Sequence, residues 1–344
     1  MVPARSARGG TTPGRVTAAM VAREAGVSPS TVSLVVAGKA EGRISAANRA
    51  KVEAAVERLG YVVDTAGSSL SKGYSPIVVL VATDIANPFY SELITAARSA
   101  LGDRYELLLS VSDVGSQAGP PSLRRLLSLR PAGFLIDAPT PALVASIPDG
   151  TNVVLLDAPD IASSWPTVNL DVTSGAAALA RHLAALGHRR VAYLDSVIDV
   201  ATFHERREAF AYTAAEAGVT VEPVARSLTS VDHARRTFAD AWPGWQASGV
   251  TAVVGCTDTH AYGVLEHAAA LGLAVPGDLA VAGFDDLPQS RQTNPPLTSV
   301  RLPARDLGAA AARTLRTLIE GGEEAAPAAL LDSELLVRES TASG

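Results

Sequence analysis

The 344-residue chain has little cysteine and no long uninterrupted apolar segment. Its single cysteine, Cys256, excludes a disulfide framework and any metal site built from several cysteines. The most apolar stretch, residues 268–284, is interrupted by glycine, proline and aspartate, so it is not expected to span a membrane. The first 14 residues have no apolar core, so no signal peptide is expected. These absences favour a globular, cytoplasmic protein with two or three domains, by the rule of roughly 100–200 residues per domain.

The sequence also lacks the short motifs of several enzyme classes. It contains no glycine-rich dinucleotide fingerprint after a strand, no P-loop and no G-x-S-x-G nucleophile motif. His204 begins a stretch like a zinc-protease helix, but no second histidine follows at spacing four. We therefore expect no enzyme activity, no cofactor and no metal.

Positive charge is concentrated at the N-terminus. Residues 1–72 have a net charge of +5, whereas the whole chain has −6. A basic head on an acidic body indicates that the head contacts a polyanion, although a solvated surface would give the same split.

The head contains three segments with helical spacing, at 18–25, 29–37 and 46–59. Each follows a residue that caps helix N-termini well, and the first and third end at a glycine. Met20 is among the residues expected to face the core. Two short helices joined by a tight, glycine-containing turn and covered by a third helix predict a helix-turn-helix.

The second of these segments is the expected reading helix. Small hydroxyl side chains on its first turn and outer face let a helix lie close in the major groove and bond to phosphates or base edges. A plain three-helix bundle with capping serines is the alternative. The candidate DNA contacts are Thr17, Ser28, Pro29, Ser30, Thr31 and Ser33.

Beyond residue 75, short apolar runs alternate with helical segments. Seven runs are rich in Val, Ile and Leu without alternation, which is typical of strands buried on both faces of a parallel sheet. The whole pattern predicts a doubly wound α/β fold, in which ligands bind beyond the carboxyl ends of the strands. The expected strands are Ile77–Ala82, Glu106–Val111, Gly133–Asp137, Val153–Asp157, Val191–Asp195, Ala252–Cys256 and Leu279–Phe284.

Residues 16–60 resemble the headpiece of the LacI/GalR family of transcriptional repressors. Later motifs extend the resemblance over about 320 residues: Asp84-Ile-Ala-Asn-Pro-Phe-Tyr90, Leu186-Gly-His-Arg-Arg190, Gly283-Phe-Asp-Asp286 and Val337-Arg-Glu-Ser340. The resemblance implies a small all-α helix-turn-helix headpiece followed by a two-lobed α/β body with parallel sheets, like a periplasmic binding protein. It implies a sequence-specific repressor whose operator affinity is controlled by a small molecule bound between the lobes.

The resemblance also implies a division of the chain. It places a disordered arm at 1–14, the headpiece at 15–62, a hinge helix at 63–75, and an effector-binding and dimerisation domain at 76–344. The chain is expected to cross between the lobes near 168–171, 294–300 and 321–327. Lobe 1 then holds about 76–168 and 298–322, and lobe 2 holds about 171–294 and 327–340.

In this family the hinge segment orders on DNA and inserts a leucine into the minor groove. Leu70 falls at that position in a Gly- and Ser-rich segment that is expected to be unfolded alone. A flexible linker with an incidental leucine is the alternative. Leu34 occupies a headpiece position where the family often has arginine, so it joins the candidate DNA contacts and the base preference of a relative cannot be transferred.

The effector site is also implied by the resemblance. Arg206 matches the family's ligand-binding arginine and Asp285 an aspartate that accepts hydroxyl protons. The remaining candidates are Asp84, Phe89, Tyr90, Asp157, and the Thr257-Asp258 pair that replaces the family's Asn-Asp. Carboxylates, one arginine and aromatic rings suit a polyhydroxylated neutral molecule, so we expect a sugar or sugar derivative.

The expected partners are therefore a palindromic DNA operator, a sugar-like effector and a second copy of the chain, with no membrane contact. Two other classes remain alternatives: a solute-binding protein of a transporter and a sugar-modifying enzyme on the same body fold.

If Leu70 is an apolar wedge, Leu70→Ala should weaken binding to operator DNA by a few kcal/mol, the approximate cost of unstacking one base step. Binding to random DNA should hardly change, because phosphate contacts remain. Parallel titrations of both DNAs measure the difference, and an equal loss on both would refute the wedge.

Overall fold

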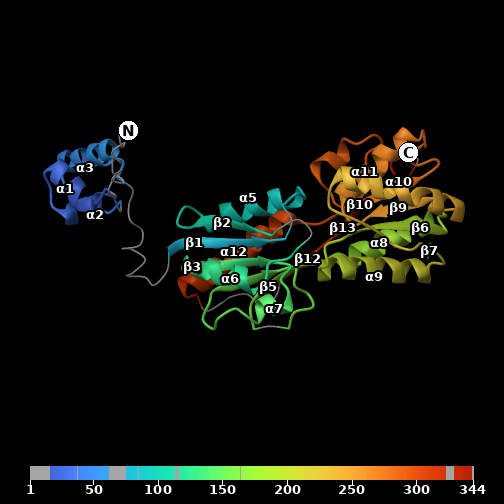
Figure 1. Cartoon of the computed structure of the whole chain (residues 1–344), viewed down its shortest axis with the longest axis horizontal. Helices are drawn as coiled ribbons and strands as arrows, with labels where there is room; N and C mark the ends of the chain where they lie inside the picture. The colour runs from blue at the N-terminus through green and yellow to red at the C-terminus, as the bar shows by residue number, and fades with distance from the viewer. Residues whose placement is uncertain are drawn as a thin grey trace, which may run out of the picture. The chain divides into compact units, whose positions relative to one another are not determined.

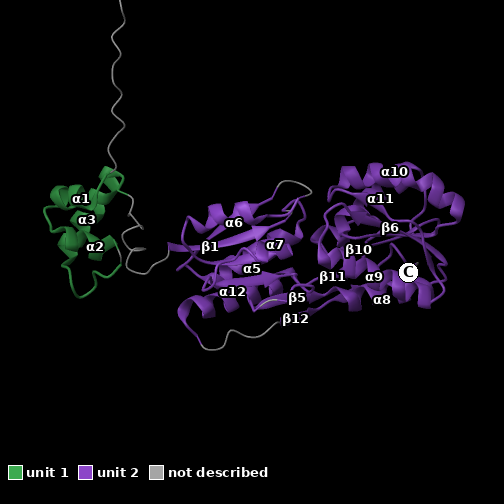
Figure 2. Ribbon diagram, turned by 60° about the horizontal axis from the view of Figure 1, so that its bottom comes forward, with its two compact units in different colours: residues 1–73 green, residues 74–344 purple. Residues whose placement is uncertain are grey.

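The computed structural model describes residues 16–36, 38–61, 75–83, 85–112, 116–162, 164–322 and 329–342. The chain forms two compact units, Met1–Gly73 and Tyr74–Gly344 (Figure 2). The arm expected at 1–14 and nearly all of the expected hinge, with Leu70, lie outside the described residues.

The small unit contains the three predicted helices, α1 (Ala18–Ala25), α2 (Pro29–Val36) and α3 (Ala46–Leu59). Thr17 caps α1 by accepting a hydrogen bond from the Met20 amide, and Ser45 caps α3 in the same way. Both helices end at a glycine in the left-handed conformation, which satisfies their last carbonyls. The three-helix prediction is confirmed.

One detail of the small core differs from the prediction. Met20 is 42% exposed, whereas Val21, Ala22 and Ala25 are buried against Val32 and neighbouring residues of α3. At 3.6 residues per turn, these three α1 residues share one face, and Met20 falls on the opposite side.

The larger unit is built on two sheets (Figure 1). The first, which defines lobe 1, has six parallel strands in the order β12-β5-β4-β3-β1-β2. Its strands are β1 (Ser75–Ala82), β2 (Glu106–Val111), β3 (Pro131–Asp137), β4 (Val153–Leu156), β5 (Thr167–Asp171) and β12 (Ala329–Asp332). Its helices are α5 (Phe89–Leu101), α6 (Pro120–Leu127), α7 (Pro141–Val144) and α12 (Ala304–Glu320).

The second sheet defines lobe 2 and has seven strands in the order β13-β11-β10-β9-β6-β7, with β8 paired to β6. All of its pairings are parallel except that of β13 with β11. Its strands are β6 (Arg190–Ser196), β7 (Thr220–Val221), β8 (Ala225–Ser227), β9 (Ala252–Gly255), β10 (Ala280–Asp285), β11 (Thr298–Arg301) and β13 (Glu334–Leu336). Its helices are α8 (Val172–Ala185), α9 (Ala201–Glu216), α10 (Val231–Ser248), α11 (Asp258–Ala270) and the 3₁₀ helix η1 (Pro288–Arg291).

Two of the three expected crossings between lobes lie later in the chain than predicted. Residues 298–301 form β11, which pairs with β10 in lobe 2, so the crossing follows residue 301. Residues 329–332 form β12, which pairs with β5 in lobe 1, so the last crossing lies at 332–334. Strand β11 reads Thr-Ser-Val-Arg and has no continuous apolar run, and in β12 the run Ala-Leu-Leu ends at Asp332.

Burial on both faces explains why the recognised strands other than the exposed edge strand β2 read as continuous apolar runs. In β1, Val78 and Leu80 pack into the core formed with α5 and α12, whereas Val79 and Val81 pack against α6 and α7 on the other face. The predicted α/β fold with parallel sheets is confirmed.

Helices α5 and α12 approach closely because Gly308 has no side chain. A Cβ atom on Gly308 would lie 2.2 Å from the Leu93 carbonyl oxygen of α5. We expect Gly308→Ala to lower the free energy of unfolding by roughly 1–3 kcal/mol, as overpacking does, and to lower Tm by several degrees. The matched control is Gly244→Ala on exposed helix α10, where a Cβ meets nothing within 4 Å; it should raise stability by up to about 1 kcal/mol. Calorimetry of the full chain measures the Tm of each variant. Equal Tm changes in Gly308→Ala and Gly244→Ala would contradict the packing argument.

Candidate functional site

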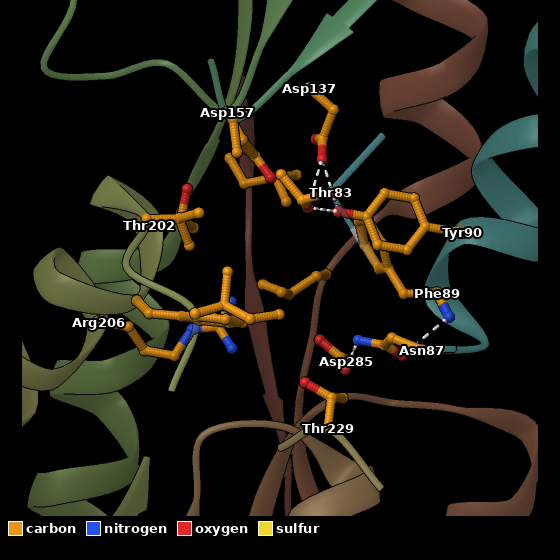
Figure 3. A pocket seen from close by; sticks show the side chains of 16 residues that line it. Thr83, Asn87, Phe89, Tyr90, Asp137, Asp157, Thr202, Arg206, Thr229 and Asp285 are labelled. Atoms are coloured by element: carbon orange, nitrogen blue, oxygen red, sulfur yellow. Dashed lines mark hydrogen bonds between the residues drawn. The ribbon is translucent and has the colours of Figure 1, made fainter. Parts of the chain in front are cut away.

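A pocket lies between the two lobes, where the carboxyl ends of β1, β3, β4 and β10 converge (Figure 3). The empty space inside it, including open solvent at the mouth, is about 540 Å³. The residues lining it are Thr83, Asn87, Phe89, Tyr90, Asp137, Ala138, Asp157, Leu170, Ile198, Val200, Thr202, Phe203, Arg206, Thr229, Asp285 and Leu302.

On the lobe 1 wall, two hydroxyl groups hold Asp137. Tyr90 Oη donates to Asp137 Oδ2 at 2.5 Å, and Thr83 Oγ1 donates to the same oxygen at 3.3 Å (Figure 3). Burial raises the pKa of Asp137 to about 6, and these hydrogen bonds to the charged form limit the rise. Burial and the Asp137 carboxylate raise the pKa of Tyr90 well above its ordinary value, so Tyr90 remains a hydrogen-bond donor.

Asp157, on the same wall, is the most perturbed of the lining carboxyl groups. It follows β4 directly and has φ of 46°, in the left-handed region, a backbone strain that concentrates at functional sites. Burial raises the pKa of Asp157 to about 8, repulsion from Asp137 adds to the rise, and Arg206 opposes it. Its Oδ1 atom is buried and has no hydrogen-bond partner in the protein.

On the lobe 2 wall, helix α9 carries Arg206, which is only 2% exposed. Its Nη1 atom donates to the Cys256 carbonyl, and its guanidinium carbon lies 4.6 Å from the ring centroid of Phe284 and 5.2 Å from that of Phe203. The Nε atom is buried and has no hydrogen-bond partner among the described residues, and the same holds for Thr202 Oγ1 nearby on α9. Buried polar atoms without partners are uncommon, and both of these belong to residues that line the pocket.

A hydrogen bond joins the two lobes across the pocket. Asn87 Nδ2, in the segment before α5, donates to Asp285 Oδ2 at 2.9 Å, while Asn87 Oδ1 accepts from the Phe89 amide at 3.0 Å. Asp285 is the last residue of β10 and has φ of 112°. Burial raises the pKa of Asp285 to about 6, and Arg206 opposes the rise.

Five of the eight residues predicted for the effector site line this pocket: Phe89, Tyr90, Asp157, Arg206 and Asp285. They come from both lobes, with the aromatic pair on α5 facing Arg206 on α9. Asp84 lies outside the described residues.

The prediction for Thr257 and Asp258 is wrong, because neither residue lines the pocket. Thr257 caps α11, with its Oγ1 atom accepting from the His260 amide at 3.3 Å. Asp258 is fully buried beneath the loop that follows β10, and burial raises its pKa to about 8. It accepts hydrogen bonds from the Leu287 amide, the Ser299 hydroxyl and the Ser290 hydroxyl, so it fixes the loop that follows Asp285.

Several polar residues of the pocket were not predicted from the sequence. Thr83 and Asp137 stand at the carboxyl ends of recognised strands, where ligands bind in such sheets, so their position could have identified them. Thr202 and Thr229 lie where no strand end or motif marks them. Asn87 was noticed only as part of a motif, because its contact with Asp285 joins residues far apart in the chain.

In the small unit, most of the candidate DNA contacts lie on α2 or directly before it. Ser28, Pro29, Ser30 and Ser33 are exposed, and Thr17 is exposed at the start of α1. The Ser28 hydroxyl lies 2.8 Å from that of Ser30 and 2.9 Å from that of Thr31. Leu34 and Thr31 are half-buried. The arrangement presents short donors and acceptors at the N-terminal end of a helix.

Two other kinds of site were sought in the described part of the chain. There, no three His, Cys, Asp or Glu side chains are grouped so that they could hold a metal ion. Nor does any helix among the same residues have the length and apolar character needed to cross a membrane.

Comparison with known proteins gives the same two-part division. Residues 15–64 match the model of bacterial regulatory proteins of the lacI family, and residues 180–341 match a periplasmic binding protein-like domain. The chain is 32% identical to the HTH-type transcriptional regulator GntR of Pseudomonas aeruginosa, over 96% of this chain and 97% of that protein. It is 31% identical to the HTH-type transcriptional regulator MalR of Streptomyces coelicolor, over 94% and 96%. A solved complex of the transcriptional regulator CelR with cellobiose is 26% identical, with a TM-score of 0.68, over 95% of this chain and all of that one.

The raised pKa of Asp157 predicts a pH dependence of stability. A carboxyl group whose folded-state pKa is raised stabilises the fold at low pH, and this contribution is lost as the pH rises through the folded-state pKa of about 8. Between pH 6.5 and 8, the free energy of unfolding should therefore fall by about 1–2 kcal/mol less in Asp157→Asn than in the wild type.

Asp258 contributes a fall in the same direction and remains in the variant, so the slope decreases without vanishing. The measurement is Tm against pH, with Asp149→Asn in an exposed turn of lobe 1 as the control that keeps the wild-type slope. A slope in Asp157→Asn equal to that of the wild type would contradict the assignment.

Proposed function

Because this chain belongs to the LacI family of DNA-binding transcriptional regulators, we propose that it represses genes from a palindromic operator and that a sugar or sugar derivative, bound between its lobes, controls operator affinity. The observation that carries the effector half of the proposal is the pocket itself. Asp157, Thr202 and Arg206 all line a cavity formed by both lobes, and each has a buried polar atom for which the described residues provide no hydrogen-bond partner.

The DNA half of the proposal rests on the small unit. Helix α2 would lie in the major groove, with Ser28, Ser30 and Ser33 near phosphates and base edges and α1 crossing the backbone. Exposed basic residues of the same unit, including Lys39 and Arg43, would contribute contacts with phosphates that do not depend on sequence. Leu70 would insert into the minor groove, as the family resemblance implies.

A sugar fits the chemistry of the walls. Carboxyl oxygens of Asp157 and Asp285 can accept hydrogen bonds from hydroxyl groups, and the ring faces of Phe89 and Phe203 suit the C–H faces of a pyranose. The related regulator CelR, which has been solved with cellobiose, supports the same class of ligand.

Palindromic operators are read by dimers, and we propose a dimer formed through the larger unit. Strand β2 stands at the edge of the lobe 1 sheet, where Leu108, Leu109 and Val111 are each more than two-fifths exposed. Proteins usually cover an edge strand that exposes apolar side chains, and a second copy of the chain would do so here.

The DNA half is tested without any knowledge of the effector. The purified full-length chain is incubated with fragments of its own genome, and the retained DNA is sequenced and verified by gel shift. Recovery of a common palindromic sequence is the expected result. Retention of random fragments alone would reject a sequence-specific regulator.

Substitution of Arg206 tests the effector half. Arg206→Ala should weaken the effector about ten- to a hundred-fold, because a charge-assisted hydrogen bond contributes roughly 1.5–3 kcal/mol. Operator binding without effector should remain. The measurement is a titration of the operator complex with whichever sugar changes its stability, and Arg236→Ala, at an exposed arginine of α10, is the control. A response of Arg206→Ala at the wild-type concentration would exclude Arg206 from the site.

A further inference from the structure

The charges that line the pocket do not balance. Three carboxyl groups, those of Asp137, Asp157 and Asp285, face one cationic side chain, Arg206, among the described lining residues. None of the three forms an ion pair with a lysine, arginine or histidine of the described chain. Buried charges without partners are costly, so the pocket has an unmet need for positive charge.

The imbalance is located on one wall. Asp137 ends β3 and Asp157 follows β4, two neighbouring parallel strands paired in register at this edge of the sheet. Figure 3 shows both carboxyl groups together on the lobe 1 side and Arg206 on the opposite side. Arg206 shares its wall with Asp285, whose charge it offsets.

The two carboxyl groups on the lobe 1 wall have different roles. Tyr90 and Thr83 both donate to Asp137, and such bonds favour its charged form. Asp157 has a free Oδ1 atom, and its pKa of about 8 means that it holds a proton at neutral pH. A hydroxyl group bound here would leave that proton in place. An ammonium group would displace it and place a positive charge between two carboxylates.

The opposite wall requires different chemistry from the ligand. Arg206 Nε is a donor without a partner, and the Thr202 hydroxyl beside it also has none. Because Asp285 already offsets the guanidinium charge, a hydroxyl or carbonyl oxygen satisfies these donors, and a carboxylate is not needed.

We propose that the effector is an amino sugar, with a positively charged amino group bound between Asp137 and Asp157 and hydroxyl oxygens bound to Arg206 and Thr202. The proposal depends on the effector pocket assigned above and narrows its ligand from sugars in general to cationic sugars. Asp137 is then the residue that determines specificity for the charged group.

The test compares matched sugars that differ only in the amino group. Glucosamine, galactosamine and mannosamine are titrated into the full-length protein at pH 6.5, where the amines are charged. Glucose, galactose, mannose and the three N-acetyl derivatives serve as neutral controls. At least one amine should bind at least ten-fold more tightly than both of its neutral counterparts. Calorimetry in buffers of different ionisation enthalpy should show that the protein releases a proton on binding it.

Two variants test which residues cause the preference for amines over neutral sugars. Asp137→Asn keeps an acceptor for Tyr90 and removes the charge, so it should reduce the amine-to-neutral affinity ratio at least ten-fold. Asp157→Asn resembles the protonated side chain, so it should fold, reduce the same ratio and abolish proton release. Asp149→Asn removes a charge from an exposed turn of the same lobe and should leave the ratio unchanged.

Three results would overturn the proposal: neutral sugars that bind as tightly as their amines in every pair, no binding by any of the amines, or an unchanged ratio in both pocket variants. The selection of operator DNA from genomic fragments uses no effector, so it tests the DNA-binding regulator separately from the amino-sugar effector. A specific operator whose complex responds to a neutral sugar alone would reject the amino sugar and leave the regulator intact. Failure to select any operator would reject the regulator itself.

Discussion

Three carboxyl groups and one guanidinium lie where two sheets meet, and the rest of the site depends on how they are compensated. Asp137, Asp285 and Arg206 are buried and Asp157 is half-buried, and charges in such positions are costly without partners. Arg206 and Asp285 offset each other on the lobe 2 wall, whereas repulsion from Asp137 raises the cost of ionising Asp157 on the lobe 1 wall. The partners that the protein does provide, Tyr90, Thr83 and Asn87, all come from lobe 1 and fix the geometry in which a ligand must bind.

The same arrangement explains how a small molecule could act on DNA binding. A ligand that bonds to both walls has a different affinity for open and closed lobes, which is the condition for shifting their equilibrium. Asn87 and Asp285 already form one bond across the cleft, so a ligand that engages Asp285 would compete with it or replace it. The lobes are joined by three short crossings, near 171, 302 and 333, and short connections of this kind are where hinges of domain closure are found.

The sequence predicts most of this architecture because buried parallel strands and capped helices leave strong local signals. The three helices of the small unit and all seven recognised strands follow from caps, glycines and continuous apolar runs. The signals fail for β11 and β12, whose sheet membership is decided by pairing with distant strands. The local signals also fail for Asp258. Like the acids of the pocket, Asp258 follows a strand, but its side chain is buried in the core and holds the loop after Asp285. Strand ends show where polar groups gather, but not which of them face the ligand.

The most direct measurement is the titration of individual aspartate carboxyl carbons by nuclear magnetic resonance in the effector-free protein, with Asp157→Asn used to assign the signal. The account predicts that Asp157 titrates near pH 8 and Asp137 near pH 6, because burial opposes the ionisation of both groups and repulsion from Asp137 adds to the rise at Asp157. Both groups titrating near pH 4, as exposed aspartates do, would show that the pocket is solvated and that its charges need no ligand to compensate them.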